Sequence, residues 1–391
     1  MQIKRFLSAL LCAAMLFSLP AAAEREAVPA AAYARSTSQH AALQEQIDQI
    51  CRRCGATGVS VAYVRDGQVL DTFAYGYATR NSDPMTADTK VRIASISKVM
   101  VGLAAHLSAE KGVLDLDQNM DELLGFHIRT QSSADVITPR SILTHTSSLR
   151  TQPTAGGYYE DLYAILTGAD ATEPIVSGSL RSWEYNNFAF YALGVAIELA
   201  NGQTMDEILN AGLCDALNID ASFWGGDLRD VEHIATIYNS DRDVTLSWEQ
   251  QAEVHSHGVG ANGAVFAGNY HISAFDLGKI IATLAADGCY AGREILSPAV
   301  VAALEAHSDQ LVPEHAFCQA QPLRWRDDMY GRGGLYYHTG SFYGEYNFIS
   351  YDPERRDGVA VLSTGASGTA QYGIYAVCGE IADLLYNTDW D

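Results

Sequence analysis

The sequence has little positive charge. Its 391 residues include 25 lysines and arginines against 47 aspartates and glutamates, which gives a formal net charge of −22 at pH 7. Only five of the basic residues are lysines, and no segment gathers basic residues into a patch. An acidic surface of this kind repels nucleic acid and anionic lipid, so neither is expected as a partner. The charge accounts for solubility and leaves the substrate open.

The sequence also lacks the signatures of several enzyme classes. No G-x-S-x-G nucleophile elbow occurs, which argues against an α/β-hydrolase, and no G-x-x-x-x-G-K-[ST] occurs, which excludes a P-loop nucleotide hydrolase. Cys51-Arg-Arg-Cys54 has no second C-x-x-C with which to form a four-cysteine metal site, and it ends an amphipathic helix instead of following a strand. The close pair His255 and His257 has no acidic or cysteine partner directly beside it. We expect no metal and no other cofactor.

Long apolar runs are absent except at the N-terminus. Two basic residues precede the run Phe6–Leu19 and three alanines follow it, which is the pattern of a signal peptide over residues 1–23, cleaved near Ala23. The run is too short to span a membrane, and no other segment could span one. We expect a secreted or periplasmic protein without a membrane anchor. Residues 24–36 are rich in alanine without a pattern and are expected to be flexible.

The rest of the chain, residues 37–391, is predicted to form one domain that contains both helices and strands (class α/β in the broad sense, α+β in the narrow sense). Two β-rich runs meet at Asp66-Gly67, a strong hairpin signal, and three short strands follow residue 325, with the last turn at Asp352-Pro353. Helical patterns cover residues 43–54, 96–107, 188–200, 205–213, 274–286, 298–304 and 372–386. Strands near both ends predict one sheet assembled from the two termini (about 37–115 and 325–391), with a helical part inserted at about 116–324.

A lysine stands in one of the most apolar segments. From Ile96 to Leu107 the apolar residues cover nearly the whole circumference of a helix, which predicts a buried helix with Lys98 inside it. Burying a lysine costs on the order of several kcal/mol unless its amine is paired or neutral. We therefore expect that a function keeps Lys98 at this position. Ser95 lies three residues earlier, on the same helix face and within reach. A serine hydroxyl needs an adjacent base to act as a nucleophile, and desolvation lowers the pKa of a lysine enough to make it one.

A second copy of this spacing, Ser108-Ala-Glu-Lys111, lies beside Gly112, which is a natural helix stop. We expect this copy to be a solvated last turn. The apolar context, and not the spacing, singles out Ser95 and Lys98.

Two later segments supply the other groups that such a pair needs, Tyr185-Asn186-Asn187 and His338-Thr339-Gly340. Together and in this order, the motifs resemble those of the penicillin-recognising serine hydrolases: class C β-lactamases, the related DD-peptidases and the esterases of the same fold. The resemblance covers about residues 40–386 and includes the segments "ITPRSILTHTSSL", "GAVFAGNYHISAFDLGKII" and "ILSPAVVAAL". It implies a β-lactamase/transpeptidase-like fold, with an antiparallel sheet flanked by helices.

The resemblance also implies roles for individual residues. Ser95 would be the nucleophile, Lys98 the base or electrostatic partner, and Tyr185 the group that hands a proton to the leaving atom. Asn187 would orient the substrate amide and Lys98. Which of Lys98 and Tyr185 takes the first proton stays open.

The substrate-facing strand would carry the motif His338-Thr339-Gly340. Thr339 would face the substrate carboxylate or carbonyl, and the backbone N–H groups of Ser95 and Ser341 would form the oxyanion hole. His338 stands where many β-lactamases have lysine, and a mostly neutral histidine binds a carboxylate more weakly.

Two other departures concern shape and charge. Ser148 replaces the glycine that usually follows "LTHTS", which puts the tightness of that turn in question, and "SFYGE" after Gly340 predicts an aromatic pocket wall that is partly acidic at Glu345. Help in binding a carboxylate is expected from one arginine of "RWRDDMYGR": Arg324, Arg326 or Arg332.

The predicted function is that of an exported, monomeric serine hydrolase. It would form an acyl-enzyme on Ser95 with D-Ala-D-Ala-type peptides, β-lactams or related amides and esters. The alternatives are a short-chain esterase or weak β-lactamase of the same fold, and a catalytically inactive member that binds cell-wall peptide. The resembled fold packs its first and last helices side by side, so a disulfide from Cys378 to Cys51 or Cys54 is expected.

Overall fold

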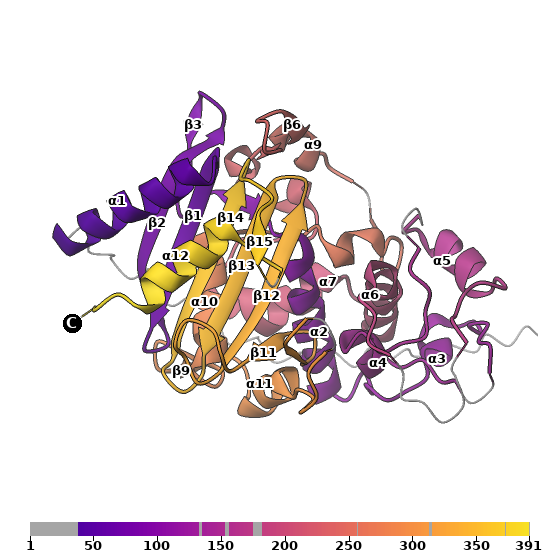
Figure 1. Ribbon diagram of the computed structural model, residues 1–391. Coiled ribbons are helices and arrows are strands. Elements are labelled where there is room, and N and C mark those ends of the chain that lie inside the picture. The colour runs from indigo at the N-terminus through magenta and orange to yellow at the C-terminus, as the bar shows by residue number, and fades with distance from the viewer. Residues whose placement is uncertain are drawn as a thin grey trace, which may run out of the picture.

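The structure is a computed structural model that describes residues 38–132, 135–152, 156–174, 182–255, 257–312, 315–371 and 373–390. The expected signal peptide and flexible segment, residues 1–36, lie outside the described residues. A large twisted sheet occupies one side of the molecule and a group of helices the other (Figure 1).

The sheet has eight antiparallel strands in the order β10-β11-β12-β13-β14-β1-β2-β3. Strands from the two ends of the chain meet at its centre, where Val61 lies opposite Val361. The strands run over Gly58–Arg65 (β1), Gln68–Thr79 (β2), Asp83–Pro84 (β3), Cys318–Gln319 (β10), Arg324–Arg326 (β11), Leu335–Phe342 (β12), Glu345–Asp352 (β13) and Asp357–Thr364 (β14). The prediction of one antiparallel sheet built from both termini is confirmed. Three short strands near the two edges, β3, β10 and β11, were not expected.

The predicted turns lie where the sequence places them. Asp66 and Gly67 join β1 to β2 with φ angles of 52° and 71°, a left-handed pair that Asp-Gly adopts readily. After β13, the Asp352 carboxylate accepts hydrogen bonds from the backbone N–H groups of Glu354 and Arg355, which closes the turn into β14.

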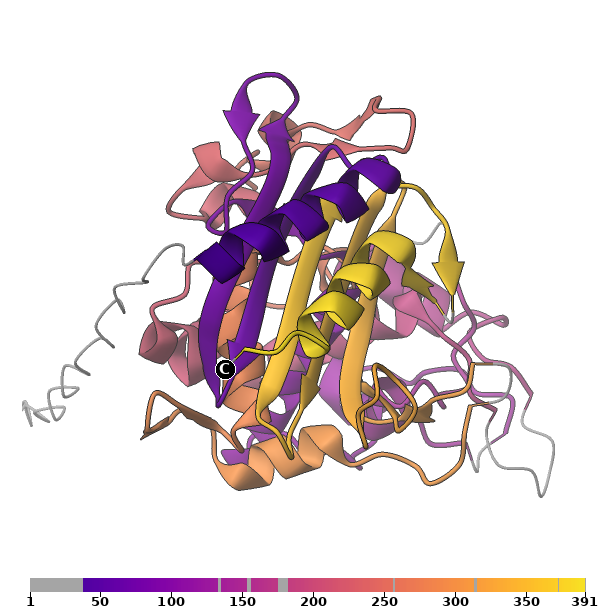
Figure 2. The ribbon, with the colours of Figure 1, turned by 60° about the vertical axis from the view of Figure 1, so that its left-hand side comes forward.

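One face of the sheet is covered by the first and last helices, α1 (Ser38–Arg53) and α12 (Ala376–Tyr386), which lie side by side across it (Figure 2). Their apolar sides form a core with the inward residues of the central strands. Helix α12 begins four residues later than the predicted 372, because Ile374–Tyr375 pairs as the short strand β16 with β15 (Ala370–Gln371). Tyr372 lies outside the described residues.

Three cysteines are buried where these two helices meet, and each is a free thiol: Cys51, Cys54 and Cys378. The expected disulfide from Cys378 is therefore wrong in this structure. The Cys378 thiol donates instead to the carbonyl of Tyr346, 3.3 Å away. Burial raises the pKa of all three thiols, which makes them poor nucleophiles.

The opposite face of the sheet is covered by α10 (Ala274–Ala285), which packs on β1, β2 and β14. The α/β part thus takes in a helix from within residues 116–324. Of the other helices, α3 (Met120–Leu124), α4 (Pro139–Leu143), α5 (Tyr159–Leu166) and α6 (Asn187–Asn201) lie to the right of the sheet in Figure 1, α9 (Trp248–Gln251) lies near the top and α11 (Pro298–Glu305) lies below the sheet. The remaining two are α7 (Met205–Leu209) and α8 (Asp215–Leu217). The helix predicted at 205–213 is divided, because a π-helical turn at Asn210–Cys214 follows α7.

Helix α2 (Ser97–Glu110) lies between the two parts and contacts α6, α7 and α11. Its residues from Ser97 to Ser108 are all buried, as the all-round apolar pattern predicts. Ser108 is fully buried, whereas Glu110 and Lys111 of the second S-x-x-K copy are exposed, so the expectation of a solvated last turn fails for the serine.

Three further two-stranded pairings lie outside the large sheet: β4 (Lys90–Arg92) with β7 (His271–Ser273), β5 (Ile237–Tyr238) with β6 (Val244–Leu246), and β8 (Cys289–Tyr290) with β9 (Arg293–Glu294). The first of these leads directly into the segment that carries Ser95. Within the described residues, no helix combines the length and apolar character that crossing a membrane requires.

Candidate active site

Ser95 lies in a short 3-10 helix (Ala94–Ile96) between β4 and α2. The residue before it, Ala94, has a φ of 46°, in the left-handed region that a residue with a Cβ seldom adopts. Such a conformation persists only where the surrounding structure holds it. The turn presents Ser95, which is partly exposed, to the start of α2.

Lys98 is fully buried in the first turn of α2. Its Nζ donates to Oγ of Ser95 at 3.2 Å and to the carbonyl of Ala267 at 2.6 Å. Burial lowers the pKa of Lys98, the ring hydroxyl of Tyr185 opposes this effect, and the charge of Arg324 adds to it. The amine is thus directed at the serine hydroxyl and has a reduced affinity for a proton.

Tyr185 stands on the other side of this pair, in the segment that leads into α6. Its ring centroid is 5.0 Å from Nζ of Lys98. Burial alone would raise the pKa of Tyr185, but the charge of Lys98 and hydrogen bonds with Lys98 and Ser95 outweigh it and lower the pKa. The next residue, Asn186, caps α6 by accepting from the N–H of Ala189 and so fixes where Tyr185 lies.

The motif His338-Thr339-Gly340 lies on β12, next to the Ser95 turn. His338 is 1 % exposed, and burial with the charges of Arg324 and Lys98 holds its pKa well below the usual range. It is therefore a neutral imidazole, with Nδ1 bonded to the carbonyl of Thr339 at 2.8 Å. Gly340 allows a close approach, since a Cβ there would stand 2.3 Å from the carbonyl oxygen of Ile93.

Of the three arginines, Arg324 is the one that reaches this motif. Its Nη1 donates to Oγ1 of Thr339 at 3.3 Å, and its guanidinium carbon lies 5.9 Å from the centroid of the Tyr185 ring. The other two are bound by acidic side chains: Arg326 by Asp328 at 2.7 Å and Arg332 by Asp357 at 3.0 Å. A fixed positive charge thus lies beside Thr339, where the histidine supplies none.

An open cleft of about 410 Å³ runs over Ser95. Asn187 and Ser341 line it, and Tyr191 and Phe342 are its aromatic lining residues. The structure therefore brings every predicted site residue to one place: Ser95, Asn187 and Ser341 in the cleft wall, and Lys98, Tyr185, His338, Thr339 and Gly340 behind or beside it.

Comparison with known proteins agrees with this arrangement. The sequence profile of the family described as Beta-lactamase matches residues 42–377. The chain belongs to the Beta-lactamase family. Among curated relatives, the esterase EstB of Burkholderia gladioli is 30 % identical over 202 residues, which are 47 % of this chain and 51 % of the esterase. Penicillin-binding protein 4* of Bacillus subtilis is 26 % identical over 166 residues, or 39 % and 35 % of the two chains.

Solved structures of the family share the fold. A D-amino acid amidase from Ochrobactrum anthropi superposes with a TM-score of 0.70 at 20 % identity, over 89 % of this chain and 97 % of the amidase. An octameric penicillin-binding protein homologue from Pyrococcus abyssi gives 0.70 at 20 % identity, over 88 % and 77 %. This chain matches about a third to a half of the length of its curated relatives.

The site contains one residue that the sequence reasoning did not assign. The ring of His145 lies 4.5 Å from that of Tyr185, and burial holds the pKa of His145 well below its usual range. It belongs to the segment "LTHTSSL", whose likeness to the family was visible but whose residues carry no chemistry on their own. The left-handed residue of this turn is His145, with φ 55°, and Ser148 instead hydrogen-bonds to the carboxylate of Asp135. A serine in place of the usual glycine is thus compatible with the turn.

The expectation that Glu345 makes the pocket wall acidic is wrong. Glu345 is fully buried and is paired with Arg92, whose Nη2 donates to it at 2.9 Å. The aromatic part of this expectation holds for Phe342, which lines the cleft, while its neighbour Tyr343 is 72 % exposed.

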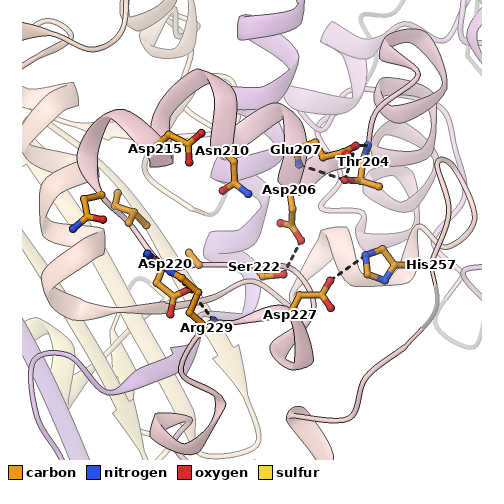
Figure 3. A pocket seen from close by; sticks show the side chains of 13 residues that line it. Thr204, Asp206, Glu207, Asn210, Asp215, Asp220, Ser222, Asp227, Arg229 and His257 are labelled. Atoms are coloured by element: carbon orange, nitrogen blue, oxygen red, sulfur yellow. Dashed lines mark hydrogen bonds and ion pairs between the residues drawn. The ribbon is translucent and has the colours of Figure 1, made fainter. Parts of the chain in front are cut away.

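A second hollow, of about 440 Å³, lies beside α7 (Figure 3). Three of its acidic side chains are bound by the protein: Ser222 donates to Asp206 at 2.7 Å, Arg229 to Asp220 at 3.3 Å, and His257 pairs with Asp227 at 3.2 Å. Burial raises the pKa of Asp206 to about 6. Ser222 here is bound to a carboxylate that also accepts from the backbone N–H of Phe223, and no lysine is among the residues that line the hollow, so the cleft over Ser95 is the candidate active site.

Proposed function

We propose that this protein is a serine hydrolase that forms an acyl-enzyme on Ser95. The observation that carries the proposal is the fully buried Lys98, whose amine lies 3.2 Å from Oγ of Ser95. A charged amine without a carboxylate partner is costly to bury, and the lowered pKa of Lys98 suits an acceptor of the serine proton.

In the proposed reaction, Oγ of Ser95 attacks the carbonyl carbon of an amide or ester and loses its proton to Lys98 or Tyr185. Tyr185, whose pKa is lowered, then returns a proton to the leaving nitrogen or oxygen as the bond to the carbonyl carbon breaks. Water adds to the resulting ester on Ser95 and releases the acid. Both groups touch Ser95, so the geometry supports either as the first base.

The proposed oxyanion hole consists of the backbone N–H groups of Ser95 and Ser341. Both residues line the cleft, and they belong to two elements that pack together, the Ser95 turn and β12. Two N–H groups fixed on packed backbone stabilise developing negative charge without having to reorganise.

The proposed substrates carry a carboxylate near the scissile bond, as D-Ala-D-Ala-type peptides and β-lactams do. Arg324 supports this, because it is held against Thr339 while His338 is neutral. An Arg fork binds a carboxylate with two parallel hydrogen bonds. The names of relatives fit acyl transfer to or from small molecules, since they include a penicillin-binding protein, an amidase and methylbutanoyltransferases.

A short-chain esterase is the second candidate. It is favoured by the 30 % identity to a protein named as an esterase and by the aromatic cleft walls. An inactive peptide-binding member is less well supported, because Ser95, Lys98 and Tyr185 are all present and in contact.

One panel tests these candidates: a D-Ala-D-Ala peptide, a p-nitrophenyl ester and a chromogenic cephalosporin, each with wild type and Ser95→Ala. We expect Ser95-dependent turnover of at least one substrate and an added acyl mass on wild type after incubation with a penicillin. No turnover and no acyl mass would contradict the proposed chemistry. Turnover of the ester alone would favour the esterase.

The role of Arg324 can be tested with a substrate pair that differs only in a terminal carboxylate or carboxamide. Because the guanidinium would meet the carboxylate in both ground and transition states, Arg324→Gln should raise KM about 10-fold for the carboxylate and leave the carboxamide nearly unchanged. The control is Arg326→Gln, on the same strand but bound by Asp328. An equal effect of Arg324→Gln on both substrates would argue against carboxylate recognition.

We also propose that the protein is exported and monomeric. Export rests on the N-terminal sequence pattern, and N-terminal sequencing of the mature protein should begin near Glu24. Light scattering tests the monomer, for which the octameric Pyrococcus homologue is a clear alternative.

A further inference from the structure

Behind the cleft lies a buried polar network that the reaction above does not use. Glu345 begins β13 and is completely buried, at a position where its side chain lies between two strands and the Ser95 turn. Its carboxylate accepts from Nη2 of Arg92 at 2.9 Å and from Nδ2 of Asn347 at 3.0 Å. It also accepts a hydrogen bond from the backbone N–H of Ala94.

These bonds converge on the chain that leads into Ser95. Arg92 is the last residue of β4, and Ala94 is the left-handed residue directly before the serine. Asn347 adds a third attachment, because its Nδ2 also donates to the carbonyl of Arg92 at 3.1 Å. Its Oδ1 accepts from the N–H of Ser363 on β14 at 3.0 Å, which ties the network to the centre of the sheet.

We propose that Glu345 is a positioning residue: through Arg92 and the N–H of Ala94, its carboxylate holds the strained Ala94 turn so that Oγ of Ser95 faces Lys98. The inference rests on the proposed function, since it concerns the same serine. A residue in the left-handed region raises the conformational free energy by about 1–2 kcal/mol. Without these bonds the backbone at Ala94 would therefore relax to another conformation. A small displacement of a nucleophile lowers the rate far more than it lowers substrate binding.

Burying the ionised carboxylate of Glu345 is costly to the fold, although the bonds of the network reduce that cost. Burial raises the pKa of Glu345 to about 7, against the opposing effects of Arg92, Asn347 and Ala94. Within the described residues, one further titratable group lies near Glu345 and Arg92. It is His271, which stands opposite Arg92 on β7, and burial together with the charge of Arg92 lowers the pKa of His271 to about 3. His271 is therefore neutral across the range in which Glu345 ionises.

The sign of the linkage follows from the raised pKa. Between the usual carboxyl range and about pH 7 the folded protein binds this proton more tightly than the unfolded chain, so ionising Glu345 lowers stability as pH rises. Glu345→Gln keeps an oxygen acceptor for the N–H of Ala94 but removes the charge. Because the buried Arg92 loses its carboxylate partner, this gain is offset, so at pH 8 we expect a folded variant that is slower than wild type.

The chain offers a matched control in Glu198. This glutamate is also buried, burial raises its pKa to about 7, and it accepts two backbone N–H bonds, from Met205 and Gly260, both at 2.7 Å. It holds the far end of α6 instead of the Ser95 turn. Glu198→Gln therefore makes the same chemical change at a distance from the serine.

The experiment measures kcat and KM for the best substrate of the panel at pH 8, per mole of folded protein, with melting temperatures alongside. For Glu345→Gln we expect kcat to fall at least about 10-fold with KM within about twofold, while Glu198→Gln stays within twofold for both. The ratio of wild-type to Glu345→Gln kcat should shrink towards pH 6, because wild type then carries a neutral Glu345 as well. Comparing the two enzymes at each pH cancels the titration of Lys98 and Tyr185.

A kcat for Glu345→Gln within twofold of wild type, or an equal loss in the Glu198→Gln control, would overturn the inference. Hydrogen exchange gives a readout that does not depend on activity: the peptide covering residues 91–96 should exchange faster in Glu345→Gln and at the wild-type rate in Glu198→Gln. If wild type shows no Ser95-dependent turnover, the proposed function fails and this exchange measurement alone decides the positioning role.

Discussion

The turn and helix around α2 carry the same S-x-x-K spacing twice, Ser95 to Lys98 at the N-terminal end and Ser108 to Lys111 at the C-terminal end. In the first copy the lysine is fully buried and the serine is partly exposed to the cleft. In the second copy the serine is fully buried and the lysine lies in solvent. The same four-residue spacing thus gives two opposite arrangements.

The bonds of each serine explain the difference. Ser108 Oγ donates to the carbonyl of Ala104 at 2.7 Å and accepts from Nδ2 of Asn201 at 3.0 Å, so its hydroxyl is used within the helices. Ser95 precedes the helix, in a turn that no i−4 carbonyl can reach, and its Oγ faces Nζ of Lys98. Chemistry therefore follows from the position relative to the helix start and from the burial of the lysine, and the spacing alone is uninformative.

The largest effect that separates the two copies should come from the serines. Ser95→Ala removes the proposed nucleophile, so acylation should fall at least about 10⁴-fold, to the limit of detection by intact-protein mass. Ser108→Ala should keep full activity and lose about 1 kcal/mol of stability, because it leaves Nδ2 of Asn201 without that acceptor. Residual acylation in Ser95→Ala at a rate close to wild type would place the nucleophile elsewhere.

The lysines should differ next. Lys98→Ala removes the proposed base, and its acylation rate should fall about 10²–10⁴-fold, the range for losing a positioned proton acceptor. Lys98→Arg should be no faster, because a guanidinium stays protonated. Lys111→Ala, at the exposed end of the helix, should acylate like wild type.

If Lys98→Ala acylates as fast as wild type, the buried lysine is structural and the two copies do not differ in function. Rates from time-resolved intact mass with a penicillin, or from a chromogenic ester if penicillins do not react, give this comparison directly.

The comparison also shows how far the sequence could predict the fold. The hairpin at Asp66-Gly67, the three strands of the second half and the buried helix were predictable, because turn residues and apolar patterns act locally. The short strands β3, β10 and β11 were not, since two or three residues carry no periodicity. Neither was the division of the helix after Leu209, where the backbone widens into a π turn.

The part of the site that is built from residues close together in the sequence was predictable. Lys98 and Ser95 are three apart, and the apolar context decided between the two copies. Contacts across the fold were out of reach without the structure: Ala267 as the second partner of Lys98, His145 against Tyr185, and the choice of Arg324 among three arginines. Glu345 shows the limit most clearly, because its place next to the pocket residues in sequence suggested exposure, whereas the strand turns it inward to Arg92.

The smallest effect, and the one that tests the burial argument alone, is the pH dependence of stability. Because the pKa of Lys98 is lowered from 10.5 by burial, the unfolded chain binds this proton more tightly than the folded protein. The free energy of unfolding therefore decreases as pH falls from 10.5 through the folded pKa of Lys98, and it increases again as pH rises towards 10.5. Lys98→Met should thus be at least as stable as the parent at pH 7, and its advantage should shrink towards pH 9.5.

Urea unfolding at the two pH values measures this difference, with both proteins in a Tyr185→Phe background so that the coupled phenol does not titrate. Lys111→Met is the control, and since that lysine is exposed, its stability difference from the parent should be the same at both pH values. Lys98→Met could instead be less stable than the parent at pH 7 by about 1 kcal/mol or more. In that case the hydrogen bonds from Nζ of Lys98 to Ser95 and Ala267 outweigh the cost of burying the amine. The amine would then be a structural cation, and the contrast with Lys111 would lie in bonding instead of in basicity.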